Sequence, residues 1–94
     1  MHFVYIVRCS DGTLYTGYAR NPEKRIAAHN AGRGAKYTIP RRPVMLVLTE
    51  EWPSRGTALK REHELKGLTR LEKEALIATT QTGPKLGRAL DDRS

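Results

Sequence analysis

The chain has few of the residues that cross-link or anchor small proteins. Its 94 residues include a single cysteine, Cys9, which excludes an internal disulfide and a zinc site built from several cysteines. The apolar run in residues 1–9 is too short for a secretory signal peptide, and no stretch reaches the length of a membrane span. We therefore expect a cytoplasmic protein without membrane contact. A chain of this length has room for one compact domain.

Acidic residues are also in the minority. Ten Asp and Glu oppose 17 Lys and Arg, which gives a net charge of +7 and a pI near 10.0. This surplus favours a polyanionic partner, although a basic surface that only aids solubility is the alternative. Within residues 20–42, Glu23 is the one acidic residue among many cations, and clustered cations favour nucleic acid. The expected backbone contacts are Arg20, Lys24, Arg33, Lys36, Arg41 and Arg42.

The N-terminal pattern predicts a β-hairpin with strands over residues 3–8 and 13–18. A two-residue loop between the strands would place Tyr5 and Tyr15 on opposite faces of the sheet. A three-residue loop, with Gly12 in the left-handed conformation, would pair Val7 with Tyr15 and place both tyrosines and Gly17 on one face. We favour the three-residue loop, because glycine suits the left-handed position.

The remaining pattern predicts three helices and one further strand. The helices are expected over residues 22–31, from a cap at Ser54 or Thr57 to about residue 67, and over residues 69–80, because each begins with capping residues and the first two end at a glycine. The apolar run over residues 44–50 predicts a strand in a buried, central position. We expect one α+β domain over residues 1–80 and a loose tail over residues 81–94.

Glu62 occupies an unusual place for a carboxylate. Its spacing from Ala58 and Leu65 puts it in or beside the apolar stripe of its helix. A carboxylate there is costly unless it is paired or binds a cation, so it is either a boundary residue held by a neighbouring arginine or a metal ligand. Considered individually, Arg25 and His29 are most simply interpreted as ordinary surface or packing residues. Together with Glu62 and the hairpin tyrosines, they could converge on one polar site.

Several motifs, in order, resemble the GIY-YIG nuclease domain. Tyr5, followed ten residues on by YTG (residues 15–17), is similar to the two tripeptides that name the family. EKRIAAHN (residues 23–30) resembles its first-helix motif, and ALKREHELK (residues 58–66) resembles its glutamate helix. The segments over residues 29–38 and 41–50 resemble its small stand-alone bacterial branch. The resemblance spans about residues 3–77 and implies a three-stranded antiparallel sheet flanked by about three helices.

The resemblance also implies metal-dependent hydrolysis of phosphodiester bonds in DNA. Tyr5 would be the general base, assisted by Tyr15, although a phenol with a pKa near 10 needs help from cations or a metal. Arg25 would stabilise charge on the phosphate, and His29 would contact phosphate or relay a proton. Glu62 would hold one Mg²⁺ (or Mn²⁺) that keeps most of its waters. The loop over residues 32–42 is either a phosphate-binding loop, formed by Gly32, Gly34, Lys36 and Arg41, or an ordinary connection between a helix and a strand.

The sequence departs from the family pattern at several places. Phe3 and Val4 replace the first two residues of the first tripeptide, Thr16 stands in the second, and no asparagine follows Asn30. The alternative is therefore a nucleic-acid-binding module that cuts weakly or not at all. A third interpretation is a protein-interaction adaptor whose positive charge is incidental. The expected substrates are structured, damaged or single-stranded DNA, with a protein partner supplying target choice. We expect DNA rather than RNA as the substrate, and a role in DNA repair, only because of the resemblance to the family.

Overall fold

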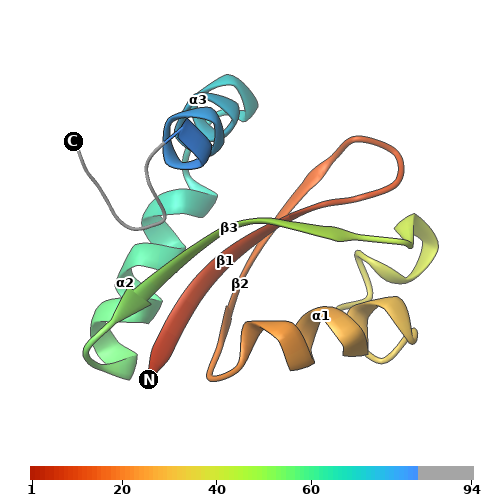
Figure 1. Ribbon diagram of the computed structural model, residues 1–94, viewed down its shortest axis with the longest axis horizontal. Helices are drawn as coiled ribbons and strands as arrows, with labels where there is room; N and C mark the ends of the chain where they lie inside the picture. The colour runs from red at the N-terminus through yellow and green to blue at the C-terminus, as the bar shows by residue number, and fades with distance from the viewer. Residues whose placement is uncertain (83–94) are drawn as a thin grey trace.

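Three strands form one antiparallel sheet in the computed structural model, which describes residues 1–82. The strands are β1 (His2–Arg8), β2 (Leu14–Ala19) and β3 (Met45–Trp52), arranged in the order β2-β1-β3 (Figure 1). The helices are α1 (Pro22–Asn30), α2 (Arg55–Lys66) and α3 (Arg70–Thr82), with a short 3-10 turn over Ile39–Arg41. The predicted α+β fold is confirmed.

The central strand is β1, so the prediction of a central position for residues 44–50 is wrong. β3 lies at an edge of the sheet and begins at Met45, which is 67% exposed. Successive residues of this strand are nonetheless apolar, because their side chains point to different faces of the sheet. Leu46 packs against one core and Val47 against the other. A strand whose two faces are both covered has a continuously apolar sequence, whether it lies at the centre or at the edge of the sheet.

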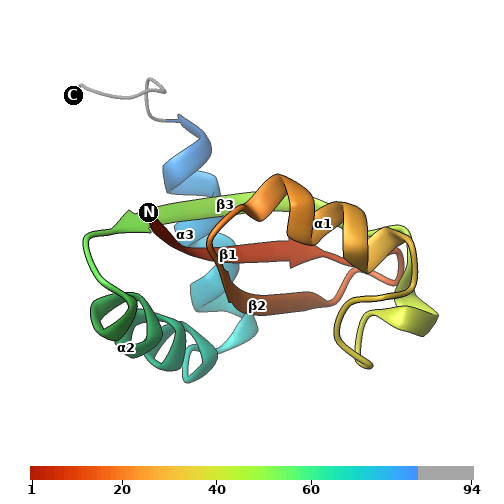
Figure 2. The ribbon, with the colours of Figure 1, turned by 90° about the horizontal axis from the view of Figure 1, so that it is seen from below.

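Each face of the sheet carries its own apolar core. The core shared with α2 and α3 contains Val4, Ile6, Leu48, Ala58, Leu65 and Ile77. The core on the other face, beside α1, contains Tyr5, Val7, Cys9, Ala19 and Val44. Figure 2 shows this division, with α1 in front of the sheet and α3 behind it. Alternate residues of β1 therefore belong to different cores, as the two-residue period of a strand requires.

The hairpin has the three-residue loop that we predicted. Val7 pairs with Tyr15 and Tyr5 pairs with Gly17. The Cys9 amide donates to the Thr13 carbonyl at 2.8 Å, which closes the loop. Gly12 has a φ of +87°, the left-handed conformation that favours glycine. Both tyrosines therefore point to the face of the sheet that α1 covers.

The helix starts follow the capping residues. The Asn21 side chain accepts from the Lys24 amide at 3.1 Å, and Ser54 is the N-cap of α2. The Thr69 hydroxyl accepts from the Glu72 amide at 3.2 Å while the Glu72 carboxylate accepts from the Thr69 amide at 2.8 Å, forming the predicted capping box.

The third helix runs to Thr82, so residues 81–82, predicted in the tail, are helical. The rest of the predicted tail, residues 83–94, lies outside the described residues. Among the helices of residues 1–82, none is long and apolar enough to cross a membrane.

Candidate active site

Tyr5 projects from the central strand and lies across its neighbour β2. Its ring passes so close over Gly17 that a Cβ at that position would lie 2.4 Å from the Tyr5 oxygen. Glycine is therefore needed at position 17 for the ring to lie flat on β2. The Tyr5 residue is 1% exposed, and its hydroxyl reaches toward α1.

The Tyr5 hydroxyl forms a buried hydrogen bond with His29 of α1. The distance from Tyr5 Oη to His29 Nε2 is 2.9 Å. On the other side of the imidazole, Nδ1 lies 2.8 Å from Thr38 Oγ1. The Thr38 hydroxyl donates its one proton to the Ala35 carbonyl at 2.8 Å, so it must accept from His29 Nδ1–H. In the neutral ring Nε2 is then unprotonated, and the Tyr5 hydroxyl donates to it.

The surroundings keep both groups uncharged near neutral pH. Burial lowers the pKa of His29 below its ordinary 6.5, and the positive charge of Arg25 lowers it further. Burial raises the pKa of Tyr5 above its ordinary 10.0, although the interaction with Arg25 opposes the shift. Tyr5 therefore holds its proton while His29 offers a lone pair to accept it.

We expect the folded protein to lose stability as the pH falls below about 6.5, because the unfolded chain then protonates His29 while the folded chain resists doing so. One proton taken up on unfolding gives a slope of up to about 1.4 kcal/mol per pH unit. This slope is measured by thermal melting of the wild type and of His29→Gln at a series of pH values from neutral to acidic. His29→Gln should reduce the slope, whereas His63→Gln, at an exposed position of α2, should keep it. Equal slopes in wild type and His29→Gln would contradict the burial of a neutral imidazole.

Two residues of the irregular segment over residues 32–38 hold His29 in place, and the sequence analysis did not single out the first of them, Thr38. Thr38 is fully buried and fixes the tautomer of the imidazole. Gly34 packs against the ring, since a Cβ there would lie 2.2 Å from His29 Nδ1. Both lie in an irregular segment without periodicity, so the sequence carries no pattern that marks Thr38. For Gly34, this contact favours a packing role over the predicted grip on phosphate.

An aromatic and cationic cluster joins the basic segment to the hairpin. Tyr15 meets the His29 ring edge-on, with centroids 5.5 Å apart, and stacks with Tyr37 at 5.9 Å. The Arg41 guanidinium lies 4.0 Å from the centre of the Tyr37 ring, and its Nε is 3.1 Å from an Asp11 carboxylate oxygen. These contacts favour a structural role for Arg41 over the predicted contact with a nucleic-acid backbone.

The charges of two other predicted site residues act on Tyr5, whose pKa burial raises. Arg25 is exposed one turn before His29, and its guanidinium acts to lower the pKa of Tyr5. The negative charge of Glu62, on α2, acts to raise that pKa. Its side chain is 18% exposed and pairs with Lys66 Nζ at 3.2 Å. The neighbour that holds this carboxylate is therefore a lysine and not an arginine.

The donor set suits one kind of metal ion. Within residues 1–82 there is no group of three or more His, Cys, Asp or Glu side chains that could hold a metal. Zinc, which takes three or four such ligands, does not fit that arrangement. A lone, partly buried carboxylate such as Glu62 fits Mg²⁺, which keeps several waters and takes few protein ligands.

Comparisons with known proteins place the chain in a family. The family model described as the GIY-YIG catalytic domain matches residues 1–75. A UPF0213 protein of Natronomonas pharaonis is 56% identical over 77 residues, which cover 82% of this chain and 91% of that protein. A UPF0213 protein of Staphylococcus aureus strain N315 is 58% identical over 76 residues, covering 81% and 93% of the two chains.

Two solution NMR structures share the fold. A UPF0213 protein of Bacillus halodurans is 45% identical, with a TM-score of 0.56, over 89% of this chain and 88% of that one. A protein of E. faecalis is 43% identical, with a TM-score of 0.59, over 86% of each chain. The chain belongs to the GIY-YIG family, a nuclease superfamily whose members generally depend on divalent metals. Its relatives within that superfamily are the UPF0213 proteins, which are small and single-domain.

Proposed function

We propose that this protein is a divalent-metal-dependent endonuclease that hydrolyses phosphodiester bonds in DNA. The observation that carries the proposal is the buried hydrogen bond from the Tyr5 hydroxyl to His29 Nε2, at 2.9 Å. Thr38 holds His29 in the tautomer that accepts a proton at this nitrogen. A tyrosine whose proton already points at an acceptor is suited to taking a proton from water.

Tyr5 acts in a proton relay rather than as a preformed phenolate. As a water attacks phosphorus, its proton passes to the Tyr5 oxygen while the phenolic proton passes to His29 Nε2. The water oxygen forms the new bond to phosphorus, and the bond from phosphorus to the leaving oxygen breaks. The leaving oxygen keeps the electron pair of that bond and takes a proton from solvent water. The raised pKa of Tyr5 is then no obstacle, because the phenol need not ionise in advance. His29 is 0% exposed, which favours the proton-relay role over direct contact with phosphate.

Arg25 and Glu62 supply charge at the phosphate. The Arg25 guanidinium stabilises the negative charge that develops on the phosphoryl oxygens. Glu62 would hold Mg²⁺ or Mn²⁺, which when bound supplies positive charge to the phosphate and the leaving oxygen. Since Tyr5 is 1% exposed, we expect bound substrate to move the exposed Arg25 side chain and so admit water to the hydroxyl.

A nucleic-acid-binding module that cuts weakly or not at all is the second candidate. The observations that favour it are the near-complete burial of Tyr5 and the pairing of Glu62 with Lys66. Both functions use the same basic surface, so binding alone does not separate them.

Tyr5→Phe should lower the rate of DNA cleavage by about 100-fold or more and leave DNA binding unchanged, because it removes the relay hydroxyl and keeps the ring over Gly17. The measurement is single-turnover cleavage of labelled single-stranded, duplex and branched DNA, with Mg²⁺ or with a chelator. Tyr37→Phe is the control, since it removes a hydroxyl from a side chain that is 40% exposed. Undiminished cleavage by Tyr5→Phe would exclude the relay. Binding without cleavage by the wild type on every substrate would favour the binding module.

A further inference from the structure

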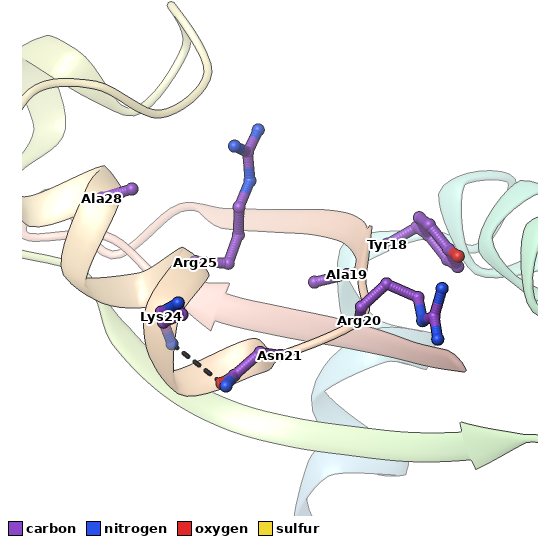
Figure 3. A pocket seen from close by; sticks show the side chains of 7 residues that line it. All are labelled: Tyr18, Ala19, Arg20, Asn21, Lys24, Arg25 and Ala28. Atoms are coloured by element: carbon purple, nitrogen blue, oxygen red, sulfur yellow. Dashed lines mark hydrogen bonds between the residues drawn. The ribbon is translucent and has the colours of Figure 1, made fainter. Parts of the chain in front are cut away.

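A shallow groove opens beside the candidate active site, where β2 ends and α1 begins. Its volume is about 410 Å³, within the range of pockets that hold small ligands. Arg25 lines this groove and also contributes to the environment of the Tyr5 hydroxyl, so the groove and the candidate site adjoin. In Figure 3 the Arg20 and Arg25 side chains extend on either side of Ala19.

The groove is lined by cations that the rest of the protein does not neutralise. Arg20, Lys24 and Arg25 form no ion pair with any carboxylate in the part of the chain that the structure describes. On the helices that cover the opposite face, by contrast, Arg61 pairs with Glu50 at 2.8 Å and Lys66 with Glu62 at 3.2 Å. The cations of the groove are therefore available for an anion from outside.

Other contacts orient the groove for a phosphate and a sugar. Arg20 Nε donates to the Met1 carbonyl at 2.8 Å, which directs the guanidinium and leaves its terminal nitrogens without a carboxylate partner among residues 1–82. The small side chains of Ala19 and Ala28 line the groove and leave room in its floor.

We propose that this groove is a second phosphate subsite, which holds the nucleotide next to the scissile phosphate. The phosphate of that nucleotide lies against Arg20 and Lys24, and its sugar lies against the alanine floor. The inference rests on the proposed function in one respect: it takes the phosphate at Arg25 to be the scissile one. Contacts to the backbone carry no sequence information, so the subsite strengthens binding to any sequence.

The test measures DNA binding without cleavage. Fluorescence anisotropy of a labelled single-stranded oligodeoxynucleotide is followed in chelator over a series of salt concentrations. The double variant Arg20→Ala/Lys24→Ala should reduce the slope of log affinity against log salt by about 0.7, because it removes the contact with one phosphate and each phosphate contact on a single strand contributes about 0.7. The control Lys60→Ala/Lys73→Ala removes the same charge from α2 and α3 and should leave the slope nearly unchanged.

A second variant separates the groove from charge in general. Ala28→Leu fills the floor without altering the net charge, and we expect it to weaken binding while the melting temperature stays close to that of the wild type. The proposal is overturned if the groove and control double variants bind alike, or if a folded Ala28→Leu variant binds as the wild type does.

These binding data, together with the single-turnover cleavage assay of the wild type, distinguish this inference from the proposed function. If the wild type binds through the groove but never cuts, the nuclease proposal falls and the subsite stands. If the wild type cuts and the groove variants bind like the control, the subsite falls and the nuclease proposal stands.

Discussion

Glu62→Gln should remove nearly all of the proposed metal-dependent cleavage and leave DNA binding intact. The substitution keeps the size of the side chain and removes the negative charge that would hold Mg²⁺. Glu62 belongs to no group of three or more His, Cys, Asp or Glu side chains within residues 1–82 that could hold a metal without it. We expect the single-turnover rate at saturating metal to fall by about 100-fold or more.

Glu64→Gln is the matched control on the same helix. Glu64 has a side chain that is 53% exposed and pairs with Arg61 at 3.3 Å, so its neutralisation changes the charge of α2 and not the candidate site. Its cleavage rate should equal that of the wild type. The stability of Glu62→Gln should also change little, because ion pairs near a surface contribute about 0–1 kcal/mol. Wild-type cleavage by Glu62→Gln would remove Glu62 from the mechanism, and a large loss of stability would assign it a structural role.

Gly34→Ala should be the most destabilising of the conservative substitutions considered for this site. The new methyl group would lie 2.2 Å from His29 Nδ1 and 2.8 Å from the His29 Cα. The second contact is with helical backbone, which cannot turn aside as a flexible side chain can. We expect the free energy of unfolding, measured by urea denaturation, to fall by about 1–3 kcal/mol or more. The near-ultraviolet circular dichroism of the nearby tyrosines should change as well.

Gly56→Ala tests the same chemical change where space is available. Gly56 lies in the first turn of α2, and a Cβ there would come no closer than 3.9 Å to Ser54 Oγ. Because alanine favours helix, this variant should be stabilised by up to about 1 kcal/mol. If Gly34→Ala proves as stable as the wild type, the segment over residues 32–38 does not press on His29 as described.

The parts of the fold that were predicted correctly are governed by local chemistry. The left-handed preference of Gly12 determined the hairpin loop, and the loop determined that Tyr5 and Tyr15 share a face. Helix starts followed from side chains that bond their own first turn, as at Asn21 and Ser54. In each case the partners lie within a few residues of one another or face each other across a tight turn.

The parts that the sequence did not predict depend on contacts between distant segments. Thr38 becomes a site residue only because an irregular segment folds back onto α1, nine residues earlier. Arg41 looked like the other basic residues until its contacts with Asp11 and Tyr37 were visible. The edge position of β3 could not be inferred from its composition, because the two helical layers cover both faces of the strand wherever it lies.

The burial of the site has a consequence for how this protein should be inactivated. Tyr5, His29 and Thr38 are among its largest fully buried side chains, so the proposed proton relay is also a structural core. Alanine scanning would therefore report loss of activity at each of these positions for reasons that mix chemistry with collapse of the interior. Isosteric replacements that delete one polar atom and preserve volume are the appropriate inactive forms. A cell carrying one of them would keep the folded protein and lack only the proposed proton relay.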